Sequence, residues 1–368
     1  MPGKIQISPR QFMILVLLYS VGTVILHTPS PLAAFAKQDA WLAAIFGTAA
    51  GLMLVWLYIK VAHLFPDLTL DQIIERVFGK WIGKLVNFTF FFWVMTTGAG
   101  IPFHVCNFIK TYWMPETPIV SLIILYVTIV IGAARLGVET FARTAELLFV
   151  PFLILLIAFI TVVAPQIKVS HIQPVLENGV TPIIRASLFY VSVISFSPVK
   201  FLMIFPFVNN SKAAGKAFYI GTCLGGILLL IIVLLNILVL GPAIMASNSA
   251  PTYALAKKIN VGDFLTRIEA IIAFIWLIST FIRAVMYFHV SLAVFANLFG
   301  IQNVRPFSAP LGMFMIVVTL VIVPSEHYIA GFLKDTWFFY AGTFGLVLPL
   351  LLLGIAKIRI LFGIPTSK

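Results

Sequence analysis

The stretch Ser195-Phe196-Ser197-Pro198-Val199-Lys200 interrupts a long apolar run that extends from residue 183 to residue 208. Pro198 has no backbone N–H to donate, and its ring disfavours helical angles at Ser197. Irregular backbone at membrane depth persists only where it is buried in protein or lines a cavity. The stretch therefore predicts a discontinuous helix that faces a site. The alternative is a proline kink whose serines bond back to the helix.

The composition places this stretch in an integral membrane protein. The chain has 368 residues, of which 61% are hydrophobic and 10% are charged, and its mean hydropathy is +1.09. Soluble domains do not have this composition, and the length suffices for about ten spans of roughly 20 residues each. The net charge of +12 indicates basic cytoplasmic loops rather than nucleic-acid binding. Cys106 and Cys223 both lie in apolar runs and are expected to be packing residues.

Ten apolar runs predict an all-α membrane domain that occupies the whole chain, residues 1–368. We expect inverted repeats at roughly 8–165 and 180–358, and lysine and arginine predominate in the loops on the side of the termini. This bias predicts that both termini are cytoplasmic. The expected spans lie near 11–36, 40–65, 85–113, 118–135, 144–164, 181–208, 213–240, 266–296, 308–323 and 336–356.

A second interruption is expected in the first span, at Gly22-Thr23, where a glycine precedes a β-branched residue and Pro29 follows shortly after. Spans one and six are five apart, so they occupy corresponding positions if the two halves of the chain are inverted repeats. Such a pair of interrupted spans is the best sequence pointer to a transporter-like site at the bilayer midplane. The alternative for Gly22 is a small residue that allows close helix packing.

Two broken helices would give the midplane a defined chemistry. Helix amino ends favour an anionic group, and helix carboxyl ends favour an ammonium group or a metal cation. One cavity with both properties fits a free amino acid, to which the hydroxyls of Ser195 and Ser197 can add hydrogen bonds. Trp93, Thr97 and His104 lie roughly on one face of the third span, and Arg283 and Tyr287 follow at i and i+4 in the eighth.

Acidic side chains are expected only in loops or near span ends, so a proton relay through midplane carboxylates is not predicted. The histidines lack metal-ligand spacing, and no nucleotide-binding, nucleophile-elbow or zinc-protease motif occurs. We therefore expect that the protein is not an enzyme and that it binds no cofactor and no metal. The acidic residues include Asp39, Asp67, Asp71, Glu75, Glu139, Glu146, Asp263, Glu269, Glu326 and Asp335.

Two short segments are expected outside the membrane. Residues 66–79 carry an apolar stripe on a charged helix, with Asp67 or Thr69 as its cap, which is typical of a helix on the membrane surface. Residues 252–258 are predicted to form an extracellular helix over the site.

Several motifs resemble those of the GerAB-type spore germination permeases, the B subunits of Ger germinant receptors. The quoted motifs are Ile7-Ser8-Pro9-Arg10-Gln11-Phe12, Gly22-Thr23, Pro29, Gln38-Asp39-Ala40-Trp41-Leu42, Phe65-Pro66, Thr69-Leu70, Gly79-Lys80-Trp81-Ile82-Gly83-Lys84 and Phe201-Leu202-Met203-Ile204-Phe205-Pro206-Phe207. The resemblance implies the amino acid–polyamine–organocation superfamily and a LeuT-like fold with five plus five inverted repeats.

The same resemblance implies a nutrient-sensing subunit in the inner spore membrane that works with an A and a C subunit. It places the ligand site where spans one, three, six and eight meet. The site residues it implies, together with those from the polar stripes above, are Gly22, Thr23, Trp93, Thr97, Ser195, Phe196, Ser197, Pro198 and Tyr287.

Two functions follow as hypotheses. The first is a germinant receptor subunit that binds a small nutrient, expected to be an L-amino acid, and signals occupancy to its partners. The second is a proton- or sodium-coupled secondary transporter for amino acids or polyamines. Ion-gradient-dependent uptake would distinguish the second from the first. An ion pathway is a weaker third hypothesis, because the polar stripes are short and central.

Overall fold

The structure, a computed structural model, describes residues 6–258, 268–322, 331–333 and 336–361. Within these ranges the chain is helical, and its one β-bridge pairs Ile7 with Val208. Asp263, Glu326 and Asp335 lie outside the described residues. The α-helices are α1 (Pro9–Val21), α2 (Val24–His27), α3 (Pro29–Ala36), α4 (Ala40–Leu64), α5 (Leu70–Phe78), α6 (Lys80–Tyr112), α7 (Ile119–Arg135), α8 (Gly137–Val163), α9 (Val180–Tyr190), α10 (Ser211–Leu240), α11 (Pro242–Ser247), α12 (Pro251–Lys258), α13 (Glu269–Phe299), α14 (Ser308–Ile322), α16 (Trp337–Gly342) and α17 (Leu348–Leu361).

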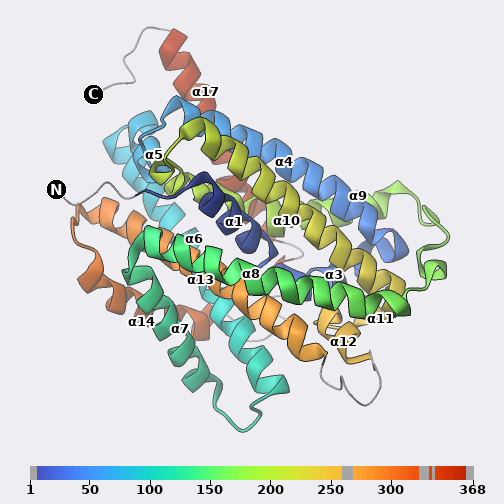
Figure 1. Ribbon diagram of the computed structural model, residues 1–368. Coiled ribbons are helices and arrows are strands. Elements are labelled where there is room, and N and C mark those ends of the chain that lie inside the picture. The colour runs from blue at the N-terminus through green and yellow to red at the C-terminus, as the bar shows by residue number, and fades with distance from the viewer. Residues whose placement is uncertain (1–5, 259–267, 323–330, 334–335, 362–368) are drawn as a thin grey trace.

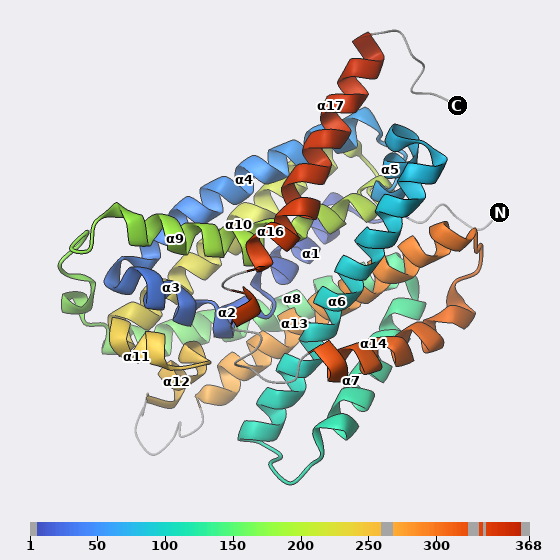
Figure 2. The ribbon, with the colours of Figure 1, turned by 180° about the vertical axis from the view of Figure 1, so that it is seen from behind.

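The long helices form the transmembrane bundle shown in Figures 1 and 2. In the described part of the chain, nine helical segments are long and apolar enough to cross a membrane, and the shorter α7 is apolar as well. These segments agree with the prediction of about ten transmembrane helices. The fifth span begins earlier than predicted, at Gly137 in α8.

The first span is broken where the sequence predicted. Helix α1 ends at Val21, and Gly22 has φ 17° and ψ −129°, outside the helical region. Thr23 restores helical angles, and the four-residue α2 follows. Thr28 then joins α2 to α3 with helical backbone angles, so the outer half of this span consists of two short helices.

The sixth span is broken as well, and its geometry is less regular than that of the first. Helix α9 passes into a π-helical turn at Val191–Ser195, and a 3-10 helix follows at Ser197–Met203. Phe196 lies between the two segments. Pro198 lies in the first turn of the 3-10 helix, where a missing N–H is tolerated.

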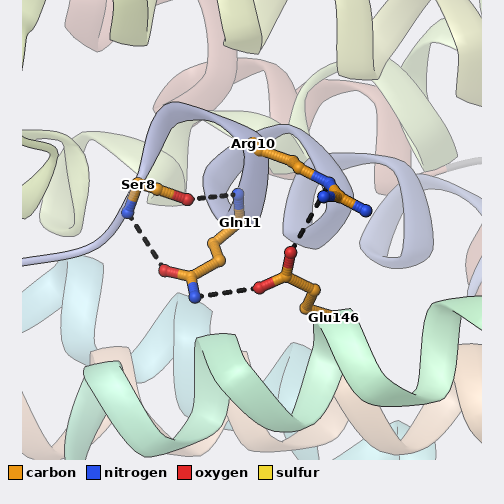
Figure 3. Close-up of polar contacts among 4 residues, drawn as sticks. All are labelled: Ser8, Arg10, Gln11 and Glu146. Carbon is orange, nitrogen blue, oxygen red and sulfur yellow. Dashed lines mark hydrogen bonds and ion pairs between the residues drawn. The ribbon is translucent and has the colours of Figure 1, made fainter.

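The amino-terminal end of the first broken span is tied to the carboxy-terminal end of the sixth. The Ile7 amide donates to the Phe207 carbonyl at 2.9 Å, and the Asn209 amide donates to the Ile7 carbonyl at 3.1 Å. Ser8 then begins α1 with a capping box that it forms with Gln11. Gln11 Nε2 also donates to Glu146 Oε2 of α8 at 3.0 Å, as drawn in Figure 3. The motif at residues 7–12 therefore anchors the inner half of the first span to spans five and six.

Short helices cover the two ends of the bundle. Helix α5 lies at the end that also carries the last turns of α17, and Arg359 donates to the Arg76 carbonyl at 3.1 Å there (Figure 2). Thr69 caps α5 in a capping box with Gln72. The sequence had offered Asp67 or Thr69 as this cap. Helices α11 and α12 cover the opposite end, and α12 includes the helix predicted at 252–258.

Glycines set the distance between α10 and the first two spans. A Cβ at Gly221 would lie 2.6 Å from the Met13 carbonyl oxygen, and one at Gly226 would lie 2.2 Å from Thr48 Cγ2. These positions allow backbones to approach closely, as small residues commonly do in membranes. Gly221 meets main chain, which has less freedom to move than a flexible side chain.

We expect Gly221→Ala to lower thermal stability, because the added methyl group must displace α1. Overpacking of this kind costs about 1–3 kcal/mol. The matched control is Gly354→Ala in α17, where an added Cβ would meet nothing within 4 Å. The melting temperature of each purified variant in nanodiscs checks this; equal values for both variants would contradict it.

Candidate functional site

A cavity of about 240 Å³ lies where the part of span one after its break and the first part of span six meet the middle of α6 and α13. Its wall is mostly apolar and includes Ile101, Phe189, Val193, Phe332 and Trp337. The main polar side chains that line it are Thr23, His27, Thr97, His104, Arg283 and Tyr287. This arrangement, apolar walls with a few converging polar groups, is typical of small-molecule sites.

Three of the predicted site residues line this cavity: Thr23, Thr97 and Tyr287. Gly22 lies immediately behind it. A Cβ at Gly22 would lie 2.5 Å from Cδ of Arg283 and 3.0 Å from the Tyr19 carbonyl oxygen. The glycine therefore permits the break in the first span and also leaves room for the arginine side chain.

Trp93 has a different environment from the predicted one. It is fully buried, does not line the cavity, and stacks on Phe344 with ring centroids 5.0 Å apart. Lys200 Nζ lies 3.6 Å from the centroid of the indole ring. Trp93 therefore holds a buried cation in the part of span six below the break.

The remaining predicted residues surround the break in span six. Ser195 and Pro198 line a separate space of about 10 Å³, which is large enough for roughly one water molecule. Ser197 Oγ hydrogen-bonds with Tyr287 Oη at 3.1 Å. Phe196 lines an apolar groove between α4 and the segment from α16 to α17, and it packs against Gly345. The predicted set is thus divided between the cavity and three neighbouring environments.

Tyr287 connects these environments. Its ring stacks on Tyr19 of α1 with centroids 5.7 Å apart, and its hydroxyl bonds to Ser197 of span six. Lys200 Nζ lies 4.3 Å from the same ring, and the guanidinium carbon of Arg283 lies 6.0 Å from it. A single phenol ring in α13 therefore contacts both broken spans and lies between two cations.

These two cations have no acidic partner in the described part of the chain. Lys200 is 0% exposed, and its Nζ donates to the Ser197 carbonyl at 3.4 Å. Arg283 is 5% exposed, and its guanidinium donates to the Val193 carbonyl at 3.5 Å. Both cations lie over aromatic faces, an arrangement that offsets part of the cost of desolvation.

Arg283, His27 and Trp337 are site residues that we did not place in the predicted set. Arg283 was recognised as part of a polar stripe, and an arginine deep in a membrane span is itself a signal of function. Trp337 gave no such signal, because it lies at the start of the last predicted span. His27 lies within the first predicted span but belongs to neither polar stripe. Among the described residues, no cluster of histidine, cysteine, aspartate and glutamate could hold a metal ion.

We expect Lys200→Met to keep or raise the melting temperature, because methionine fills a similar space and removes a buried charge. Trp93→Leu should lower it, because the cation then loses its closest aromatic face. Lys60→Met is a matched control, since the exposed Lys60 also lies over a tryptophan, at 5.5 Å from Trp56. A larger loss from Lys200→Met than from Trp93→Leu would show that the charge stabilises the fold.

Solved structures share this architecture at low sequence identity. Mhp1, a nucleobase-cation-symport-1 family transporter, superposes with a TM-score of 0.67 at 12% identity, covering 99% of this chain and 95% of Mhp1. MhsT in complex with L-phenylalanine superposes with a TM-score of 0.64 at 13% identity, covering 100% of both chains. The fold is LeuT-like, with broken helices in spans one and six.

Sequence comparison identifies relatives that match over most of both chains. Spore germination protein KB of Bacillus subtilis (strain 168) is 26% identical over 333 residues, which cover 89% of this chain and 88% of the relative. The putative spore germination protein YfkT of the same organism is 26% identical over 350 residues, covering 94% and 95%. A family profile described as spore germination protein matches residues 6–327. The chain therefore belongs to the spore germination permease family, as its motifs indicated.

Proposed function

We propose that this chain is the nutrient-binding B subunit of a spore germinant receptor. The observation that carries the proposal is the cavity at the two helix breaks, in a chain that belongs to a germination family. The proposed ligand is an L-amino acid, and the proposed partners are an A and a C subunit. The proposed location is the inner spore membrane, with both termini in the cytoplasm.

The position of the cavity supports a binding role. Its walls come from both broken spans, so a bound molecule would contact elements that are not continuous helices. A ligand shifts a conformational equilibrium only if its affinity differs between the two states. Contact with both breaks provides a means for such a difference, whether or not the ligand is then transported.

The outer half of the first span is also joined to the extracellular-side helices. Thr252 of α12 donates to the Ile25 carbonyl at 2.7 Å, and Ser30 donates to the Ala246 carbonyl at 3.0 Å. Asn236 of α10 donates to Thr252 at 3.0 Å. A change at the cavity wall can thus reach α11 and α12, where a partner subunit could detect it.

We expect Gly22→Leu to abolish the germination response, because the leucine side chain would occupy the space of the Arg283 stem and the break. The measurement is the loss of optical density of spores exposed to single L-amino acids, with subunit amounts checked by immunoblot. The control is Gly132→Leu in α7, where an added Cβ meets nothing within 4 Å.

A normal response from Gly22→Leu spores would refute the proposed role of the cavity. Uptake of labelled amino acids into vesicles that contain the chain alone separates sensing from transport. Uptake driven by a proton or sodium gradient would favour a coupled transporter instead. Response without such uptake would favour a receptor.

A further inference from the structure

The described lining of the cavity carries a positive charge and no negative one. Arg283 is the charged side chain in its described lining, which includes two imidazoles, threonine hydroxyls and the Tyr287 phenol but no carboxylate. The buried guanidinium therefore gives the cavity a positive character. A ligand that carries only a positive charge would be repelled, and at this depth the repulsion is weakly screened.

Within the described residues, most of the hydrogen-bonding capacity of Arg283 is unused. A guanidinium has five N–H donors in a planar fork, and the Val193 carbonyl accepts one bond at 3.5 Å. The aromatic faces of Tyr19 and Tyr287 lie 5.0 Å and 6.0 Å from the guanidinium carbon. A buried cation with spare donors is costly unless an acceptor, usually an anion, completes its shell.

Two backbone amides at the breaks are already bonded and are not free to bind an anion. The Gly22 amide donates to the Leu18 carbonyl at 3.0 Å, and the Phe196 amide donates to the Val191 carbonyl at 3.1 Å. These amides are satisfied within their own helices. Arg283 is the charged side chain in the described lining of the cavity, so its guanidinium is the side-chain donor best placed to bind an anion.

We propose that Arg283 binds the carboxylate of the ligand through its guanidinium fork, and that the ligand's amino group is dispensable. The ligand class is a small carboxylate with an apolar body. This inference rests on the proposed function and specifies which part of the amino acid is recognised. Carboxylates match the fork geometry of arginine in bidentate pairs.

The apolar wall favours an organic anion over an inorganic one. Ile101, Phe189, Val193 and Trp337 surround most of the 240 Å³ space. A chloride or phosphate ion on Arg283 would leave this apolar volume unfilled, whereas a hydrocarbon body removes it from water. The ammonium group has no described carboxylate to bind, and the guanidinium opposes a second positive charge nearby.

The test on the unaltered protein compares four phenyl compounds by thermal shift and calorimetry, with the full chain in nanodiscs. The probes are L-phenylalanine, 3-phenylpropionate, L-phenylalaninamide and 2-phenylethylamine, and a leucine series (L-leucine, 4-methylpentanoate, L-leucinamide, 3-methylbutylamine) repeats the design. At least one carboxylate pair should bind, with the amino acid and its deaminated acid within about tenfold of each other. The amide and the amine should bind at least about 30-fold more weakly, as expected when a buried charge pair loses one partner.

Variants test the role of the side chain directly. Arg283→Gln should weaken carboxylate binding by at least about 30-fold. The carboxylate affinity of Arg283→Lys should lie between those of the unaltered protein and Arg283→Gln, because lysine keeps the charge but loses the fork. Arg185→Gln is the matched control, since Arg185 is exposed on α9 of the same broken span. If Arg283→Gln does not fold, Arg283→Lys and the probe series decide the question.

Three results would overturn the inference: amide or amine binding as tight as the acid, no binding by either acid, or an equal shift from phosphate or chloride alone. Its failure is separable from that of the proposed function. Carboxylates that bind without any amino acid germinating the spores would leave the inference intact and refute the receptor role. Spores that respond equally to an amino acid and its amide would refute the inference alone.

Discussion

The structure depends on the burial of two cations between broken helices, without a described carboxylate beside them. In the low dielectric of a membrane bundle an isolated charge is expensive, so aromatic faces and carbonyl oxygens must replace the missing water. Trp93 and Tyr287 enclose Lys200, and Tyr19 covers Arg283. The break in span one opens space for the arginine stem, and the Ser197 carbonyl at the break in span six accepts from both Lys200 Nζ and Tyr19 Oη.

Local features of the sequence were sufficient to predict the breaks and the caps. Gly22 and Pro198 disturb the helix through their own backbone chemistry, and the capping box at Thr69 needs only its near neighbour Gln72. The direction of each side chain around its helix depends instead on tertiary packing. Tertiary packing places Thr97 in the wall of the cavity, whereas Trp93 on the same span does not line it.

The π-helical turn at Val191–Ser195 explains why the side-chain directions around the second break were not predicted. A π turn inserts one residue into a helix, which rotates everything after it by about 100° relative to a regular 3.6-residue helix. Ser195 therefore faces the small space beside α4 and α10, and Phe196 packs on Gly345 instead of the cavity. A turn of this kind has no single-residue signature, unlike the glycine and proline that mark the breaks.

Arg283 is the group through which an anion would affect both halves of the first span. Its guanidinium lies over Tyr19 in the inner half, and its stem fills the gap at Gly22 that separates the two halves. An anion that neutralises this charge weakens its attraction to the Tyr19 face and to the Val193 carbonyl of span six. The contacts that hold the breaks in one arrangement would then be the same contacts that the ligand replaces. Such competition gives the ligand different affinities for two arrangements, which is the physical requirement for a sensor and equally for a carrier.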